Sequence, residues 1–163
     1  MALVENTLAT ELQNLVPVGT EVEGINNFAA AFETYFSDAV VSGTPANPGS
    51  LASATTALKA AMTGANSNAA LAIQNGITAF WGVVATAFAT IWTTVPALIA
   101  VVQPPNLSTL EASLNTAFSS NISGELEIGP ATAAIAAVIH PTQLGGIATL
   151  GPPPPGGTPV PIL

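Results

Sequence analysis

The sequence has 163 residues, which is enough for one domain with a substantial hydrophobic core. Charged residues make up 6% of it, against about a quarter in ordinary soluble domains, and Lys59 is the only basic residue beside nine acids. Because electrostatic binding to nucleic acid or to anionic lipid headgroups depends on Lys and Arg, this composition excludes both. The absence of cysteine excludes disulfides and thiolate metal sites, and the first 15 residues lack the basic n-region of a secretory signal.

Two amphipathic helices are predicted near the start of the chain. The first spans residues 3–15, where Leu8 and Leu12 recur at helical spacing on one face. Thr20 followed by Glu23 has the form of a capping box, so a second helix is expected to begin there and to run to about residue 41. Its aromatic residues alternate with alanines and are predicted to pack in the core: Phe28, Phe32, Tyr35 and Phe36.

Two breaks are predicted in the middle of the chain. Residues 42–50 contain two prolines and two glycines, which favour a loop. Ser50 at the end of this loop is expected to cap a third, alanine-rich helix that begins at Leu51. Residues 103–107 contain two consecutive prolines and are expected to end whatever structure precedes them.

The stretch around which the chain is organised runs from Ile73 to Val102. It carries no charge and contains both tryptophans. Its apolar residues follow spacings of three and four, which predicts a long helix from about Ser67 to Thr94, ended by Pro96. The residues with this spacing are Ile73, Ile77, Phe80, Val84, Phe88, Ile91 and Val95.

This stretch has two interpretations. Residues 77–102 are uncharged over more than the roughly 20 residues that span a bilayer, which favours one transmembrane helix. However, Trp81 and Trp92 lie only about 16 Å apart along a helix, too close to mark both edges of a roughly 30 Å hydrocarbon core. Five threonines and the lack of a basic flank also favour the second interpretation, a helix enclosed by protein.

The last third of the chain is predicted to contain two more helices and an extended tail. Ser108 and Glu111 suggest a second capping box, before a helix over residues 109–122. Residues 124–128 alternate polar and apolar and allow one short strand, and a last helix over residues 131–140 is expected to end at Pro141.

Residues 151–163 are too rich in proline for a helix or a sheet interior, so we expect an extended docking arm beyond a helical domain of residues 1–150. Its prolines are Pro152, Pro153, Pro154, Pro155, Pro159 and Pro161.

Residues for chemistry are scarce. His140 is the only histidine, and no G-x-S-x-G motif accompanies it, so a serine hydrolase is not indicated. No acids have metal-ligand spacing, and no glycine-rich loop has the form that binds phosphate. We therefore predict no catalytic residue, no cofactor and no metal, and an all-α fold of four to five helices around the central one.

Low charge with abundant alanine, threonine, glycine and proline is similar to the composition of many small bacteriophage virion proteins. The alanine-rich helical start also resembles mycobacterial PE and PPE proteins, although their Pro-Glu or Pro-Pro-Glu signature is missing and residues 80–82 lack the W-x-G spacing of their smaller relatives. No residue role is carried over from either likeness.

We expect a structural subunit of a large homo-oligomeric assembly, such as a tail, neck, baseplate or capsid-associated protein of a virion assembled in the host cytoplasm. Its partners would be copies of itself and other subunits, and a small membrane protein is the alternative. The expected packing or interface residues are Phe28, Phe32, Phe36, Phe80, Trp81, Phe88 and Trp92.

Overall fold

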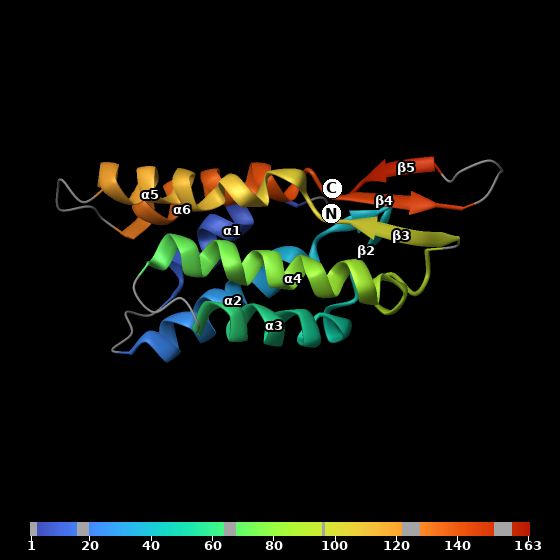
Figure 1. The fold of residues 1–163 in the computed structure, drawn as a ribbon, viewed down its shortest axis with the longest axis horizontal. Coiled ribbons are helices and arrows are strands. Elements are labelled where there is room, and N and C mark those ends of the chain that lie inside the picture. Colours follow the sequence, from blue (N-terminus) through green and yellow to red (C-terminus); the bar gives the residue numbers. More distant parts are fainter. Residues whose placement is uncertain (1–2, 16–19, 64–67, 96, 122–127, 152–157) are drawn as a thin grey trace.

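The computed structural model describes residues 3–15, 20–63, 68–95, 97–121, 128–151 and 158–163, and within them the chain is mostly helical (Figure 1). Its α helices are α1 (Glu5–Gln13), α2 (Glu21–Ser37), α3 (Ala52–Thr63), α4 (Ala69–Ile91), α5 (Leu110–Asn121) and α6 (Ile128–Gln143). Two small antiparallel sheets accompany them: β1 (Val40–Val41) with β2 (Thr44–Pro45), and β3 (Leu98–Val102) with β4 (Ile147–Leu150) and β5 (Thr158–Pro161). Short 3₁₀ turns lie at Pro48–Ser50 and Pro105–Thr109. The all-α expectation therefore holds only as a mostly α fold, and the described residues form six α helices where four to five were expected.

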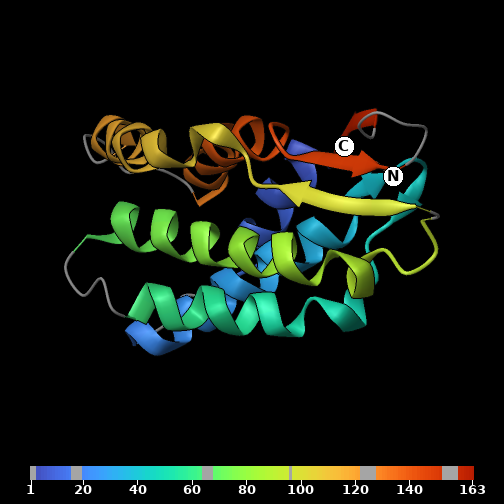
Figure 2. The same ribbon diagram turned by 45° about the vertical axis from the view of Figure 1, so that its right-hand side comes forward.

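Helix α4 occupies the middle of the molecule, as its apolar pattern predicts. Helices α3 and α5 both pack against it, and α1 packs against α2 and α6. Figures 1 and 2 show α5 and α6 on one side of α4 and α2 and α3 on the other, with the three-stranded sheet continuing beyond the end of α6. Gly76 permits the close approach of α3 to α4, because a Cβ there would lie 2.6 Å from Cγ of Met62.

Helix α1 lies within the predicted residues 3–15, and α2 begins where the sequence predicts but ends early. The capping box of Thr20 and Glu23 is present, and Leu8 and Leu12 are buried in α1. Residues 40–41, expected to be helical, form β1 instead. The hairpin to β2 turns through Ser42 (φ 50°) and Gly43 (φ 84°), the pair of positive φ angles that a type I′ turn requires.

The third helix begins at Ala52, after the first 3₁₀ turn, so Ser50 is not its N-cap residue as expected. The Ser50 hydroxyl donates instead to the carbonyl of Thr90, at 2.8 Å. A tertiary contact with the end of α4 therefore takes the place of a local cap.

The long apolar stretch is not one helix. Helix α4 ends at Ile91, three residues before the expected end, and residues 98–102 form β3. The predicted span of residues 77–102 is therefore divided between a helix and a strand. The change follows from composition, because the β-branched Ile99, Val101 and Val102 favour a strand, and the residue before Pro96 is biased away from helical angles.

The predicted helix over residues 109–122 is confirmed as α5, but its predicted capping box and the predicted end of the last helix are wrong. Glu111 does not complete a capping box with Ser108: its N–H donates to Oε1 of Gln74 and its carboxylate accepts from Nδ2 of Asn68. Helix α6 continues through Pro141 to Gln143. A proline in the last turn removes few helical hydrogen bonds, and the buried Gln143 side chain anchors that turn.

The tail is part of the fold where the structure describes it. Residues 158–161 form β5, an edge strand of the sheet in the order β3-β4-β5. Ile162 is fully buried, and Leu163 exchanges two backbone hydrogen bonds with Val40, at 2.7 and 3.1 Å. The expected extended arm is therefore not observed for residues 158–163. The expectations for Pro152–Pro155 and for a strand at residues 124–127 lie outside the described residues.

Candidate assembly surface

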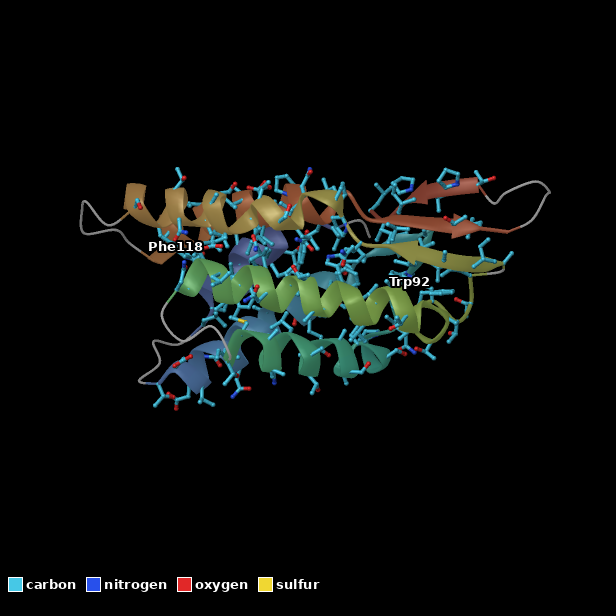
Figure 3. All side chains as sticks on the ribbon, in the orientation of Figure 1. Trp92 and Phe118 are labelled. Atoms are coloured by element: carbon cyan, nitrogen blue, oxygen red, sulfur yellow. The ribbon has the colours of Figure 1, made fainter. Side chains whose placement is uncertain are left out.

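Most of the predicted packing residues lie inside the domain. Phe32, Phe36, Phe80 and Trp81 are fully buried and meet edge to face across α2 and α4, with ring centroids 4.9–5.2 Å apart for three of the pairs. Phe28 and Trp92 are also buried, whereas Phe88 is partly buried against the same core. Figure 3 shows Trp92 at the end of α4 nearest the sheet. The six buried rings build the core of the domain, while Phe88 keeps part of its surface exposed.

Two hydrogen bonds tie α6 to this aromatic core. The Trp81 indole N–H donates to Oε1 of Gln143 at 2.7 Å, and both residues are fully buried. The Tyr35 hydroxyl lies 2.8 Å from Nδ1 of His140. The sequence signals that singled out Trp81 and His140 did not predict these partners, which lie 62 and 105 residues away along the chain.

The environment of His140 is set by burial and by its contact with Tyr35. Burial lowers the pKa of His140 and outweighs the opposing effect of Glu5, and burial raises the pKa of the Tyr35 hydroxyl. The pair therefore stays neutral at neutral pH and links α2 to α6. Among the described residues, no cluster of three or more His, Asp or Glu side chains could hold a metal ion.

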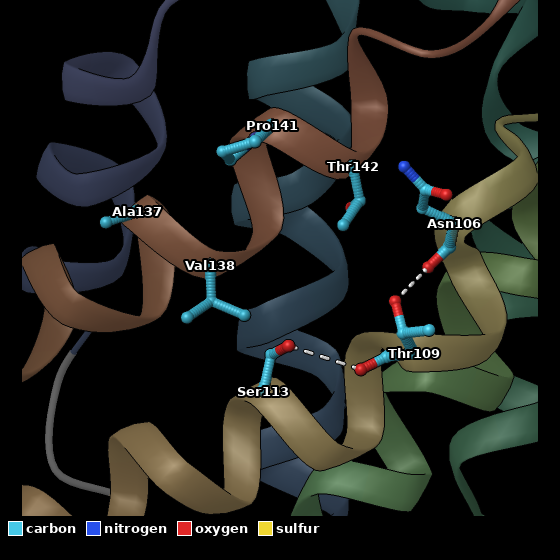
Figure 4. Close-up of a pocket in the computed structure, with 7 residues that line it drawn as sticks. All are labelled: Asn106, Thr109, Ser113, Ala137, Val138, Pro141 and Thr142. Carbon is cyan, nitrogen blue, oxygen red and sulfur yellow. Dashed lines mark hydrogen bonds between the residues drawn. The ribbon is translucent and has the colours of Figure 1, made fainter.

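Two surface hollows are lined by neutral side chains. The smaller, about 350 Å³, lies between α6 and the start of α5, where the Thr109 hydroxyl donates to the Asn106 carbonyl at 2.9 Å (Figure 4). The larger, about 500 Å³, lies beside the end of β3 and is lined by amides, hydroxyls and prolines such as Gln103 and Pro104. Neither contains an ionisable side chain among its lining residues, so neither offers acid–base chemistry.

The three-stranded sheet has one buried and one exposed face. Val101 and Ala148 are buried on the inner face, opposite Val160 in the register. The alternate residues point outward and form what we call the outer sheet face. Its residues are Ile99, Ala100 and Val102 from β3, Ile147 and Thr149 from β4, and Pro159 and Pro161 from β5.

Three of the exposed large apolar side chains of the described residues lie on this face, and two more lie close to the sheet in sequence. Of the seven exposed large hydrophobic side chains in the described residues, five lie in the sheet or within three residues of it. They are Ile99 (54% exposed), Val102 (53%), Ile147 (42%), Leu144 (40%) and Leu163 (47%). No charged residue lies in any of the three strands, whereas the charged residues of the described chain lie on or beside α1, α2, α3 and α5. Exposed apolar side chains gathered in one uncharged place are typical of an interaction surface.

This surface was not predicted from the sequence, because no strand was assigned to residues 98–102, which lie beyond the predicted end of the central helix, and residues 158–161 were assigned to an arm. The run Leu-Ile-Ala-Val-Val of β3 is rich in β-branched residues, and this signal for a strand was available. Comparison with models of known protein families, with curated proteins and with solved structures found no match.

Proposed function

We propose that the protein is a non-enzymatic structural subunit of a homo-oligomeric assembly, and that the outer sheet face is a contact between subunits. The observation that carries this proposal is that three exposed large apolar side chains, Ile99, Val102 and Ile147, lie on one uncharged face. An apolar face of this kind gains free energy when a partner removes it from water, by about 25 cal/mol for each Å² of apolar area.

The distribution of charge supports association through this face. The chain has a net charge of −8, so two copies repel each other wherever their acidic helices approach. The sheet itself does not add to this repulsion, because none of its three strands contains Asp, Glu, Lys or Arg. Subunit contacts of obligate oligomers are likewise depleted of charge at their centre.

Within this class, a virion component such as a tail, neck, baseplate or capsid-associated protein is the more specific proposal. It is supported by the likeness of the composition to small bacteriophage virion proteins. The same proposal places the protein in the virion after assembly in the host cytoplasm, with copies of itself and other virion subunits as partners.

A membrane protein is the alternative function. Helix α4 is long and apolar enough to cross a bilayer, with 23 residues and a mean hydropathy of 1.3, although the core helix of a soluble protein meets the same criterion. The exposed positions of α4 favour the assembly subunit, because Thr78, Gly82, Thr86 and Thr90 offer little of the large apolar surface that stabilises a helix in lipid. The large apolar side chains of α4 pack in or against the core of the domain.

The proposal is tested by the mass of the purified protein. Size-exclusion chromatography with light scattering, without detergent, should give a discrete multiple of 16.2 kDa, and negative-stain electron microscopy should show a regular particle. A monomer at every concentration tested would overturn the proposal. Recovery only in detergent, together with flotation on neutral phosphatidylcholine vesicles, would favour the membrane alternative instead.

A further inference from the structure

The hydroxyl of Tyr35 has one hydrogen-bond partner among the described residues, Nδ1 of His140 at 2.8 Å. Tyr35 is fully buried, so water does not provide another acceptor for its hydroxyl proton. The two rings meet edge to face, with their centroids 6.0 Å apart and their planes at 75°. The contact therefore joins α2 to the last turn of α6 through one hydrogen bond and one ring contact.

Burial of the Tyr35 hydroxyl determines which nitrogen of His140 carries the proton. Nδ1 accepts a hydrogen bond only in the neutral tautomer that has its proton on Nε2. The other tautomer would donate from Nδ1 to the Tyr35 oxygen and leave the buried hydroxyl proton without an acceptor, which is unfavourable. His140 is only partly buried, and its Nε2 is not among the buried polar atoms of the described residues that lack a partner, so water can hydrate Nε2–H. The geometry therefore selects the Nε2–H tautomer, with Tyr35 as the donor.

Protonation of His140 reverses this hydrogen bond. The added proton goes to Nδ1, which becomes a donor and no longer accepts from Tyr35. The Tyr35 oxygen can then accept from Nδ1, but the hydroxyl proton loses its only acceptor in the part of the chain that the structure describes. Burial lowers the pKa of His140 from its ordinary value of about 6.5, so the reversal belongs to mildly acidic solution and not to neutral pH.

One charge opposes the effect of burial on His140. Glu5 at the start of α1 favours the protonated imidazole, and its effect is smaller than that of burial. The acid of α5, Glu111, binds Asn68 instead, and neither the turn at Pro105–Thr109 nor the described part of α6 carries another titratable group. Further acids of α1 and α2 are Glu11, Glu21, Glu23, Glu33 and Asp38.

Helix α6 is held by few buried side chains, so the loss of one contact weakens its attachment. Between residues 131 and 143, the buried apolar residues are Ala136 and Ile139, and the buried polar residue is Gln143. Helix α2, by contrast, buries seven residues, of which four are aromatic. Elements with few buried apolar contacts open locally at a lower free energy than the core. Loss of the bond from Tyr35 is therefore expected to open α6 before the core helices.

We propose that Tyr35 and His140 form a pH-sensitive switch: a proton bound at Nδ1 of His140 ends the hydrogen bond donated by Tyr35 and loosens α6, while α2 and α4 stay folded. The switch lies within one subunit, so it does not depend on the proposed function. It assigns the single histidine of the chain to the attachment of one helix.

The tautomer can be measured on the wild-type protein without any substitution. Long-range ¹H–¹⁵N correlation spectra of the single imidazole should show its proton on Nε2 at about pH 8, and protons on both nitrogens below the pKa of His140. A neutral imidazole that carries its proton on Nδ1 would overturn the proposal.

Hydrogen exchange measures the opening of α6. After correction for the intrinsic pH dependence of exchange, opening of α6 should rise by at least about fivefold between about pH 8 and about pH 5, in step with the protonated fraction of His140. Amides of α2 and α4 in the same samples should keep their protection. An equal loss of protection in all three helices would mean global unfolding and would contradict the switch.

Two variants separate the switch from general effects of acid. His140→Asn places an amide oxygen near the position of Nδ1, so it can accept from Tyr35 without titrating, and α6 should stay protected at both pH values. Tyr35→Phe removes only the hydroxyl, so α6 should already be loosened at about pH 8 and the pKa of His140 should rise toward its ordinary value. The proposal fails if α6 of His140→Asn opens in acid as in the wild type, or if Tyr35→Phe leaves both the opening and the pKa unchanged.

Discussion

The contribution of the hydrogen bond between Trp81 and Gln143 to stability can be measured, because a second buried tryptophan in the same core serves as a control. Trp81→Phe removes the donor of a 2.7 Å bond and leaves Oε1 of the fully buried Gln143 without its partner. A buried acceptor that loses its partner costs about 1–3 kcal/mol. The Nε2 group of Gln143 keeps its bond to the Thr142 hydroxyl, at 2.7 Å, so the amide stays in place.

Trp92→Phe is the matched control. Trp92 is 1% exposed, and its indole nitrogen has no hydrogen-bond partner within the part of the chain that the structure describes. The two substitutions remove the same atoms from the same aromatic core, so the loss of packing is similar in both. We therefore expect Trp81→Phe to be less stable than Trp92→Phe by about 1–3 kcal/mol, or roughly 3–10 °C in Tm for a domain of this size.

Urea denaturation followed by far-ultraviolet circular dichroism measures both free energies of unfolding without relying on tryptophan fluorescence. The double variant Trp81→Phe/Gln143→Leu removes both partners, so its loss should be smaller than the sum of the two single losses. Two results together would refute a stabilising bond between Trp81 and Gln143. Trp81→Phe and Trp92→Phe would lose equal free energy of unfolding, and the losses of Trp81→Phe and Gln143→Leu would add in the double variant.

Three further predictions concern the ends of elements and the pH. Ile162→Ala should lower the free energy of unfolding by about 2–5 kcal/mol, because Ile162 is fully buried, while Leu163→Ala should change it by less than about 0.5 kcal/mol. Guanidinium denaturation measures both free energies. If both variants lost equally little stability, the C-terminal segment would not belong to the core. Ala97 has φ 63°, so Ala97→Gly should stabilise the protein by roughly 1 kcal/mol, whereas Ala60→Gly within α3 should destabilise it by a similar amount. A lower free energy of unfolding in both variants would contradict backbone strain at residue 97. Burial lowers the pKa of His140 in the folded state, so the contribution of His140 to stability is full above its ordinary pKa and is lost as pH falls through the lowered value. His140→Gln should therefore flatten this part of the curve of unfolding free energy against pH. An unchanged slope in His140→Gln would count against the lowered pKa.

Helix signals contained within a few residues were read correctly from the sequence. The capping box of Thr20 and Glu23 begins α2 as expected, and the spacing of Ile73, Ile77 and Phe80 marks the buried face of α4. These signals are local, because a cap or one turn of a helix involves residues three or four positions apart. They are therefore largely independent of the rest of the fold.

Capping patterns whose side chains bind distant parts of the chain were interpreted wrongly from the sequence. Ser50 and Glu111 both have the form of helix caps, yet their side chains bond to Thr90 and Asn68 in the structure. A hydroxyl or carboxylate satisfies its hydrogen bonds wherever a partner is closest, and the sequence does not show which distant partner that is. Pro141 was expected to end α6 for the same reason, since the buried bond from Trp81 to Gln143 that anchors the last turn is not visible locally.

The spacing of apolar residues determined that the chain is mostly helical with a long apolar helix at its centre, and its composition excluded a basic binding surface. Only the tertiary structure decided the environment of the apolar residues beyond Ile91 and of the prolines at positions 159 and 161. A strand becomes stable only when its backbone is paired, and β3 is paired with residues about 50 positions further along the chain. That pairing turns part of the apolar stretch and the end of the tail into one sheet, and it creates the exposed apolar face on which the proposed function depends.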